Sequence, residues 1–113
     1  MGKVETYSQL IQTLLAERAE HEDIGGEIEP QLIFDTERHH YLLMSEGWRK
    51  QKHRIYGITI HMDIKDDGKI WVQWNGTEED FLETLTNKGV PIVDIVNGMH
   101  MPHMREWRKT YRE

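Results

Sequence analysis

The stretch RIYGITIHMDIKDDGKIWVQWN, residues 54–75, decides the fold class. Apolar and polar residues alternate on both sides of a short polar turn, which is the pattern of two β-strands that each have one buried face. A turn this short joins two paired strands only when they run antiparallel. The stretch therefore predicts a β-hairpin at the centre of an antiparallel sheet.

The turn KDDGK, residues 65–69, allows two strand registers, and the side chains favour one of them. A two-residue loop would place Asp63 opposite Val72, so that polar residues would face apolar ones across the hairpin. A three-residue loop, residues 66–68 with Gly68 in the left-handed conformation, pairs apolar residues with one another. We predict this second register, with Ile64 opposite Ile70, Met62 opposite Val72, Ile60 opposite Trp74, Asp63 near Trp71 and His61 near Gln73.

The same alternation divides the first of these strands into two faces. The face predicted to lie in the core holds Tyr56, Ile58, Ile60, Met62 and Ile64. The face predicted to be exposed to solvent holds Gly57, Thr59, His61, Asp63 and Lys65.

A helix and two strands are predicted before the hairpin. Apolar residues from Tyr7 to Leu15, with Arg18, follow one helix face, and Thr6 with Gln9 has the spacing of a capping box. Gly25 and Gly26 can supply the positive φ that ends such a helix. Residues 31–48 then predict two strands joined by a turn at 36–38.

Two short helices are predicted after the hairpin. Thr77 is expected to cap the first, whose buried stripe is Phe81, Leu82 and Leu85, and Gly89 to close it. Pro91 is expected to open the second, which runs through Ile92, Ile95 and Val96 and ends at Gly98. The chain, residues 1–113, is thus expected to form a single α+β domain. Its antiparallel meander sheet would have four strands, or five at most, with N-terminal and C-terminal helices on one face.

Composition excludes several function classes. The 113 residues include no cysteine, which removes disulfides, thiolate metal sites and cysteine nucleophiles. The acidic start lacks the basic flank and apolar run of a signal peptide, and no apolar run has the length of a membrane span, so we expect a cytoplasmic protein. A net charge of −6 disfavours a protein that binds nucleic acid over its whole surface.

Positive charge is nevertheless concentrated in two places. One is the group Arg49, Lys50, Lys52 and Arg54, and the other is the tail with Arg105, Arg108, Lys109 and Arg112. We interpret both as solvated segments, while contact with an acidic partner or with DNA remains the alternative.

Histidines suggest metal binding or acid–base chemistry, but their spacing is weakly specific. His39 and His40 are adjacent on a strand and point to opposite faces, so they cannot share one ion unless the backbone bulges. His61 and Asp63 share a face, and we interpret them as a hydrogen-bonded surface pair. His100 and His103 would still need ligands from elsewhere. We therefore predict no metal site and no cofactor.

No catalytic motif is present in the sequence. Ser8 and Ser45 are the only serines, neither lies in a nucleophile elbow, and no glycine pattern matches a phosphate-binding loop. A carboxylate site for magnesium is disfavoured because the turn itself requires two of the candidate acids. Those candidates are Asp35, Glu37, Asp63, Asp66 and Asp67.

The polar face of the hairpin is better interpreted as a contact surface, because an aromatic residue among polar ones is typical of interfaces. Trp71 lies on this face, and the alternative is that a neighbouring strand or loop covers it. We expect a homodimer or a complex with a companion, formed by this face or by the turn at Trp48 and Arg49. The candidate interaction surface comprises Trp48, Arg49, Lys50, Lys52, Arg54, Thr59, His61, Asp63, Trp71 and Gln73.

Three segments, LIFDTERHHYLLMSEGW, RIYGITIHMDIKDDGKIWVQWNGTEED and NKGVPIVDIVNGMH, resemble the XisI family, the fdxN element excision controlling factors of cyanobacteria. The resemblance implies an XisI-like α+β fold and a role in cutting a DNA element from the chromosome during heterocyst differentiation. It implies an XisH-like companion and a site-specific recombinase as partners, and it supplies no catalytic residue.

The leading hypothesis is therefore a non-enzymatic accessory protein that binds a protein partner. Two alternatives stay open. One is a metal-dependent, nuclease-like hydrolase built on His61, Asp63 and a nearby carboxylate. The other is direct DNA binding through the basic group at residues 49–54.

Overall fold

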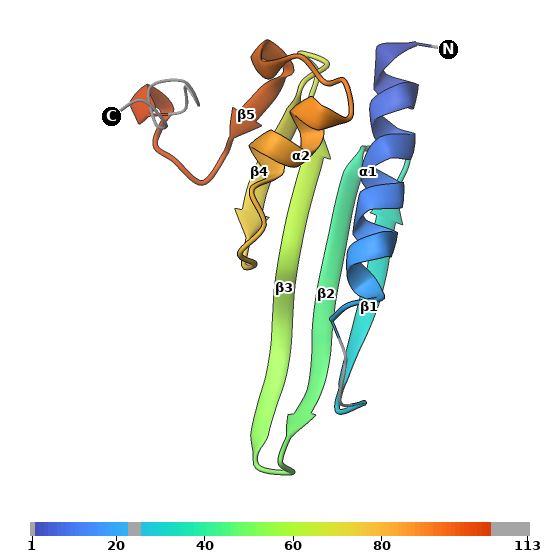
Figure 1. Ribbon diagram of the computed structural model, residues 1–113, viewed down its shortest axis with the longest axis vertical. Coiled ribbons are helices and arrows are strands. Elements are labelled where there is room, and N and C mark those ends of the chain that lie inside the picture. Colours follow the sequence, from blue (N-terminus) through green and yellow to red (C-terminus); the bar gives the residue numbers. More distant parts are fainter. Residues whose placement is uncertain (1, 23–25, 105–113) are drawn as a thin grey trace.

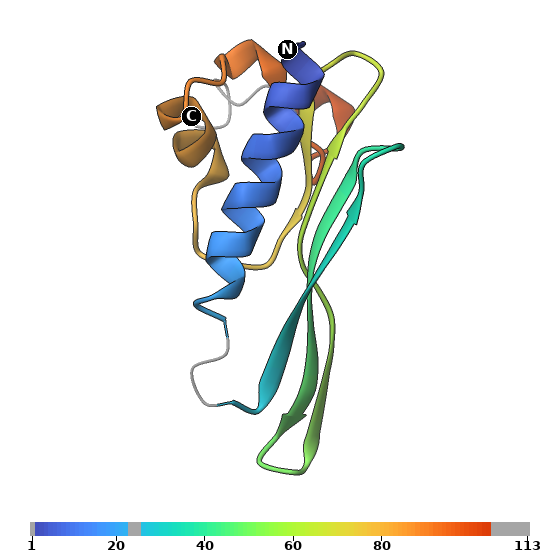
Figure 2. The same ribbon diagram turned by 90° about the vertical axis from the view of Figure 1, so that its right-hand side faces the viewer.

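The computed structural model describes residues 2–22 and 26–104, which form one mixed five-stranded sheet with two α-helices. The strands follow the chain in the order β1-β2-β3-β4-β5, and both helices lie on the same side of the sheet (Figures 1 and 2). The fold class predicted from the sequence is confirmed, with one correction at the last strand. The elements are α1 (Lys3–Ala19), β1 (Ile28–Asp35), β2 (His40–Arg49), β3 (His53–Ile64), β4 (Ile70–Asn75), α2 (Phe81–Asn87) and β5 (Ile95–Asn97).

The core lies between the helices and the part of the sheet that they cover. Ile11 and Leu15 of α1 and Leu85 of α2 are fully buried, and they pack against the inward side chains of β2, β3 and β4. Burial of such apolar side chains is the main stabilising term of the fold. The fully buried strand residues are Tyr41, Leu43, Ile60, Met62, Ile70 and Val72.

The β3–β4 hairpin has the predicted three-residue turn. Ile64 pairs with Ile70, Met62 with Val72, and Gly68 has a φ of 76°. The prediction fails beyond Met62, because the register shifts there and His61 pairs with Trp74, so that Gln73 is an extra residue on β4. Ile60 is therefore opposite Asn75 and not Trp74.

A second bulge corrects the predicted faces of β3. Leu43 pairs with Ile60 whereas Met44 pairs with Ile58, which leaves Thr59 as the extra residue. An extra residue reverses the alternation for the part of the strand that precedes it. Tyr56 and Ile58 consequently lie outside the core, with 68% and 43% of their surface exposed.

Both predicted N-terminal helix caps, Thr6 and Thr77, were wrong. Thr6 lies inside α1, where its hydroxyl donates to the carbonyl of Gly2, the residue that precedes the helix. Thr77 is held in a turn by Asn75, which accepts hydrogen bonds from its amide and its hydroxyl, so Asp80 caps α2 instead. Gly89 has positive φ just after α2, as expected. Gly26 also has positive φ, but it does not end α1, because that helix ends at Ala19 with the right-handed Glu20 as its C-cap. Gly25 lies outside the described residues.

The segment after Pro91 is not the predicted helix. A single 3₁₀ turn, Ile92–Asp94, leads into β5, which pairs parallel to β4. A strand can run parallel to its neighbour here because α2 provides the crossover connection. The purely antiparallel description therefore holds for β1–β4 only. None of the described helices is long and apolar enough to cross a membrane.

Candidate functional site

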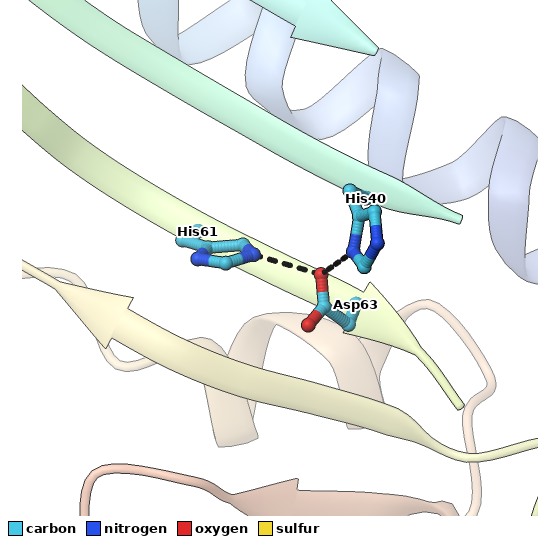
Figure 3. Close-up of side chains that lie close together, drawn as sticks. All are labelled: His40, His61 and Asp63. Carbon is cyan, nitrogen blue, oxygen red and sulfur yellow. Dashed lines mark hydrogen bonds and ion pairs between the residues drawn. The ribbon is translucent and has the colours of Figure 1, made fainter. Parts of the chain in front are cut away.

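Three polar side chains converge on the side of the sheet that faces away from the helices (Figure 3). His61 and Asp63 lie two residues apart on β3, and His40 begins β2 directly opposite Asp63. The Nδ1 atom of His40 and the Nε2 atom of His61 are each 2.8 Å from Oδ1 of Asp63. We call these three residues the His–Asp–His cluster.

Local sequence explains why His40 reaches the cluster. In the turn after β1, Oδ1 of Asp35 accepts the amide hydrogens of Glu37 and Arg38, and His39 has a φ of 62°. The turn thus ends at His40, which is the first residue of β2. His39 lies in the turn and not on the strand where it was expected, and its ring bonds the hydroxyl of Tyr41 at 2.8 Å. His39 and His40 therefore make separate contacts.

Asp63 is the buried centre of the cluster, with 6% of its surface exposed. Burial opposes ionisation of its carboxyl group, but hydrogen bonds from His40, His61 and Gln73 outweigh burial and lower its pKa. The Gln73 amide donates to Oδ2 at 3.1 Å, so both carboxylate oxygens have partners. Asp63 is therefore an ionised group held in one position.

An open cleft of about 380 Å³ adjoins the cluster on the side of His40 and Asp63. Arg38 and Lys65 bring positive charge to it, and Asp66 and Asp67 bring negative charge. Lys65 also lies over the ring of Trp71, 4.3 Å from its centre, while Asp67 accepts a hydrogen bond from the indole nitrogen. Trp71 is therefore partly covered by its own hairpin turn.

The predicted interaction residues fall into two groups. His61, Asp63 and Gln73 meet in the cluster, and Trp71 lies beside it because it pairs with Asp63. Thr59 does not join them, because its hydroxyl bonds that of Ser45 on β2. The second group lies at the far end of the β2–β3 hairpin and comprises Trp48, Arg49, Lys50, Lys52 and Arg54.

Arg54 organises an aromatic cluster at that far end. Its guanidinium lies 5.5 Å from the ring centre of Trp48 and 5.4 Å from that of Tyr56, and it pairs with Glu46 at 3.2 Å. Both distances lie within the range in which a cation is attracted to the face of an aromatic ring. Trp48 is nevertheless 52% exposed.

Sequence reasoning missed His40 and Tyr56 as members of these two groups. Detecting His40 requires the β2–β3 register, and detecting Tyr56 requires the bulge at Thr59. His100 and His103, which the sequence disfavoured as metal ligands, lie after β5 and outside the one cluster of metal-ligating side chains found among the described residues.

The helices α1 and α2 leave the opposite face of the sheet uncovered (Figure 2). That face carries several exposed apolar residues. Residues that pair across strands share a face, so Tyr56, Ile58 and Trp48 lie on the same face as the His–Asp–His cluster. We call this the outer face. Its apolar members with large exposure are Ile33, Trp48, Tyr56, Ile58 and Trp74.

Comparison with known proteins identifies the family. The sequence profile described as XisI protein matches residues 1–110, which is almost the entire chain. The chain belongs to the XisI family. No curated protein matches the sequence, but solved structures of other XisI proteins do.

Two of these structures come from Anabaena variabilis ATCC 29413. An XisI-like protein is 43% identical, with 92% of this chain and 94% of that chain covered and a TM-score of 0.84. The fdxN element excision controlling factor XisI is 27% identical, with coverage of 90% and 97% and a TM-score of 0.76. The XisI fold of this chain therefore extends over nearly the full length of both relatives.

Proposed function

We propose that this protein is a controlling factor in the programmed excision of a DNA element, and that it acts by binding a protein partner rather than by catalysis. Membership of the XisI family supports the process, since a relative of the same fold carries the name of an excision controlling factor. The absence of a nucleophile motif from the sequence supports a non-catalytic role.

The exposed outer face is the observation that carries the binding proposal. Several of its large apolar side chains are between two-fifths and two-thirds exposed, and they are contributed by neighbouring strands. Contiguous exposed apolar surface of this kind marks sites of protein association in soluble proteins. Trp, Tyr and Arg, the residue types of the aromatic cluster, are also those that dominate binding energy in interfaces.

The proposed occupant is an XisH-like companion, which the family resemblance implies, with a site-specific recombinase as the enzyme of the complex. The aromatic cluster would supply the anchor, and the polar His–Asp–His cluster would lie towards the rim. Such an arrangement of an apolar centre and a polar rim is typical of protein interfaces. Pairing of two copies through the same face is the competing outcome.

Sedimentation velocity of the purified protein, alone and with the companion, tests this proposal. We expect a heterocomplex that the double substitution Tyr56→Ala with Ile58→Ala abolishes while circular dichroism stays unchanged. Val93→Ala is the matched control, because Val93 is equally exposed but lies outside the sheet. Complex formation that survives the double substitution would refute the outer face as the binding site.

A second candidate function is DNA contact by the tip of the β2–β3 hairpin, which projects beyond the helices (Figure 1). Arg49, Lys50 and Lys52 are exposed there, whereas Arg54 is engaged with Glu46. Band-shift titration at low salt decides this function. Binding that is lost on changing Arg49, Lys50 and Lys52 to glutamine, but not in Lys88→Gln, would favour it.

A further inference from the structure

We propose that the His–Asp–His cluster binds one divalent first-row transition metal ion, for which zinc is the probe. The ligands are Nδ1 of His40, Nε2 of His61 and a carboxylate oxygen of Asp63. This inference goes beyond the proposed function and does not depend on it, because it concerns the chain alone.

The donor atoms already have the spacing of a ligand set. All three lie within 4.8 Å of one another, and both ring nitrogens are 2.8 Å from the same carboxylate oxygen. Ligand atoms at zinc distances around a tetrahedral ion are separated by about 3.3 Å. Moving the side chains by about 1 Å, without moving the strands, would place one ion between them.

Each ring can present a lone pair to a metal ion by changing to its other neutral tautomer. Because an ionised carboxylate can only accept, each imidazole must donate an N–H to make its hydrogen bond to Asp63. On metal binding the proton of each ring would reside on the other nitrogen, which is Nε2 in His40 and Nδ1 in His61. The side chain of His40 is half exposed, so its Nε2–H can be satisfied by water.

Gln73 orients the carboxylate for this role. It holds Oδ2 of Asp63 and thereby leaves Oδ1 directed at the imidazoles. Gly98 in turn makes room for Gln73, because a Cβ atom at position 98 would lie 2.4 Å from Oε1 of Gln73. Outer-shell hydrogen bonds of this kind raise metal affinity by fixing the first ligands. Gln73 is thus a positioning residue.

The ligand types select the metal class. Two imidazoles and one carboxylate suit zinc, nickel, copper or iron, whereas magnesium and calcium prefer oxygen ligands only. Three protein ligands leave at least one coordination position unfilled. The adjoining cleft gives that position access to water or to a donor atom of another molecule.

Isothermal titration of chelator-treated, dialysed protein with zinc chloride tests the inference. We expect saturable binding of one ion per chain, a higher melting temperature with zinc, and much weaker binding of magnesium. His40→Ala should abolish the saturable binding, and its exposed position makes it a variant that should still fold. Gln73→Ala should weaken zinc binding by about 10- to 100-fold.

His53→Ala is the matched control, because His53 is exposed at the far end of the same hairpin. The paired substitution His100→Ala with His103→Ala removes the other histidine pair near the end of the described chain. Absence of saturable zinc binding would overturn the inference. Zinc binding that persists in His40→Ala would also overturn it. Loss of that binding in the His100 and His103 variant would then place the ion elsewhere.

Discussion

Replacing Asp63 with asparagine tests how the buried carboxylate stabilises the fold. The substitution preserves shape but removes the charge that three hydrogen bonds converge on. Hydrogen bonds to a charged group contribute about 1.5–3 kcal/mol each and neutral ones about 1 kcal/mol. Allowing for the half-exposed His40, we expect Asp63→Asn to lower the free energy of unfolding at neutral pH by about 2–3 kcal/mol.

The same substitution predicts a specific pH dependence. Because the pKa of Asp63 is lower in the folded state than in the unfolded chain, its contribution is present above the unfolded pKa of about 4. That contribution is lost as the pH falls through the folded pKa.

Urea denaturation with a metal chelator present, repeated from pH 7 downwards, measures both effects. The stability difference between the natural protein and Asp63→Asn should be constant at neutral pH and shrink below about pH 4. Asp66→Asn, in the exposed turn nearby, should change stability by less than about 0.5 kcal/mol. Equal stabilities at pH 7, or a difference unchanged at the lowest pH, would refute the reasoning.

Three further predictions concern the scaffold. Gly98→Ala should lower the free energy of unfolding in urea by about 1–3 kcal/mol, because the added methyl group would displace Gln73. Gly57→Ala is the control, because a Cβ atom there meets no atom within 4 Å and should cause no steric destabilisation. Burial and a hydrogen bond to Asp94 raise the pKa of Tyr7 to about 12. The free energy of unfolding should therefore fall as the pH rises from about 10 to 12, and Tyr7→Phe should remove that fall. Lys50 and Gln51 both have positive φ, so changing them to asparagine and glycine should raise the melting temperature by relieving about 1 kcal/mol of backbone strain each.

The sequence predicted the part of the fold that local chemistry dictates. The β3–β4 turn followed from Gly68 and from the demand that Ile64 meet Ile70, and both were confirmed. The core residues of α1 followed from helical spacing. These features depend on residues close together in the chain.

Features that depend on an extra residue in a strand escaped prediction. Period-two alternation gives no sign of the bulge at Thr59, yet that bulge moves Tyr56 and Ile58 from the expected core to the outer face. The strand β5 was missed because Ile95 and Val96 fit a short helix as well as a strand until β4 is present to pair with them.

The candidate site was half predictable. His61 and Asp63 share a face by alternation, and the sequence places them together. His40 joins them only through the β2–β3 register, which depends on the hairpin tip and on the bulge at Thr59. At the tip, Lys50 and Gln51 have positive φ, which their residue types do not predict. A metal site with ligands from two strands therefore required the structure.

Site-specific photo-crosslinking tests the central claim, that the outer face binds the partner, most directly. A photoreactive phenylalanine analogue would replace Tyr56 on the outer face or Val93 in the 3₁₀ turn, both exposed by more than half. With the XisH-like companion present, we predict a covalent adduct from position 56 and none from position 93. An adduct from position 93 alone, or equal adducts from both positions, would contradict the outer face as the site of binding.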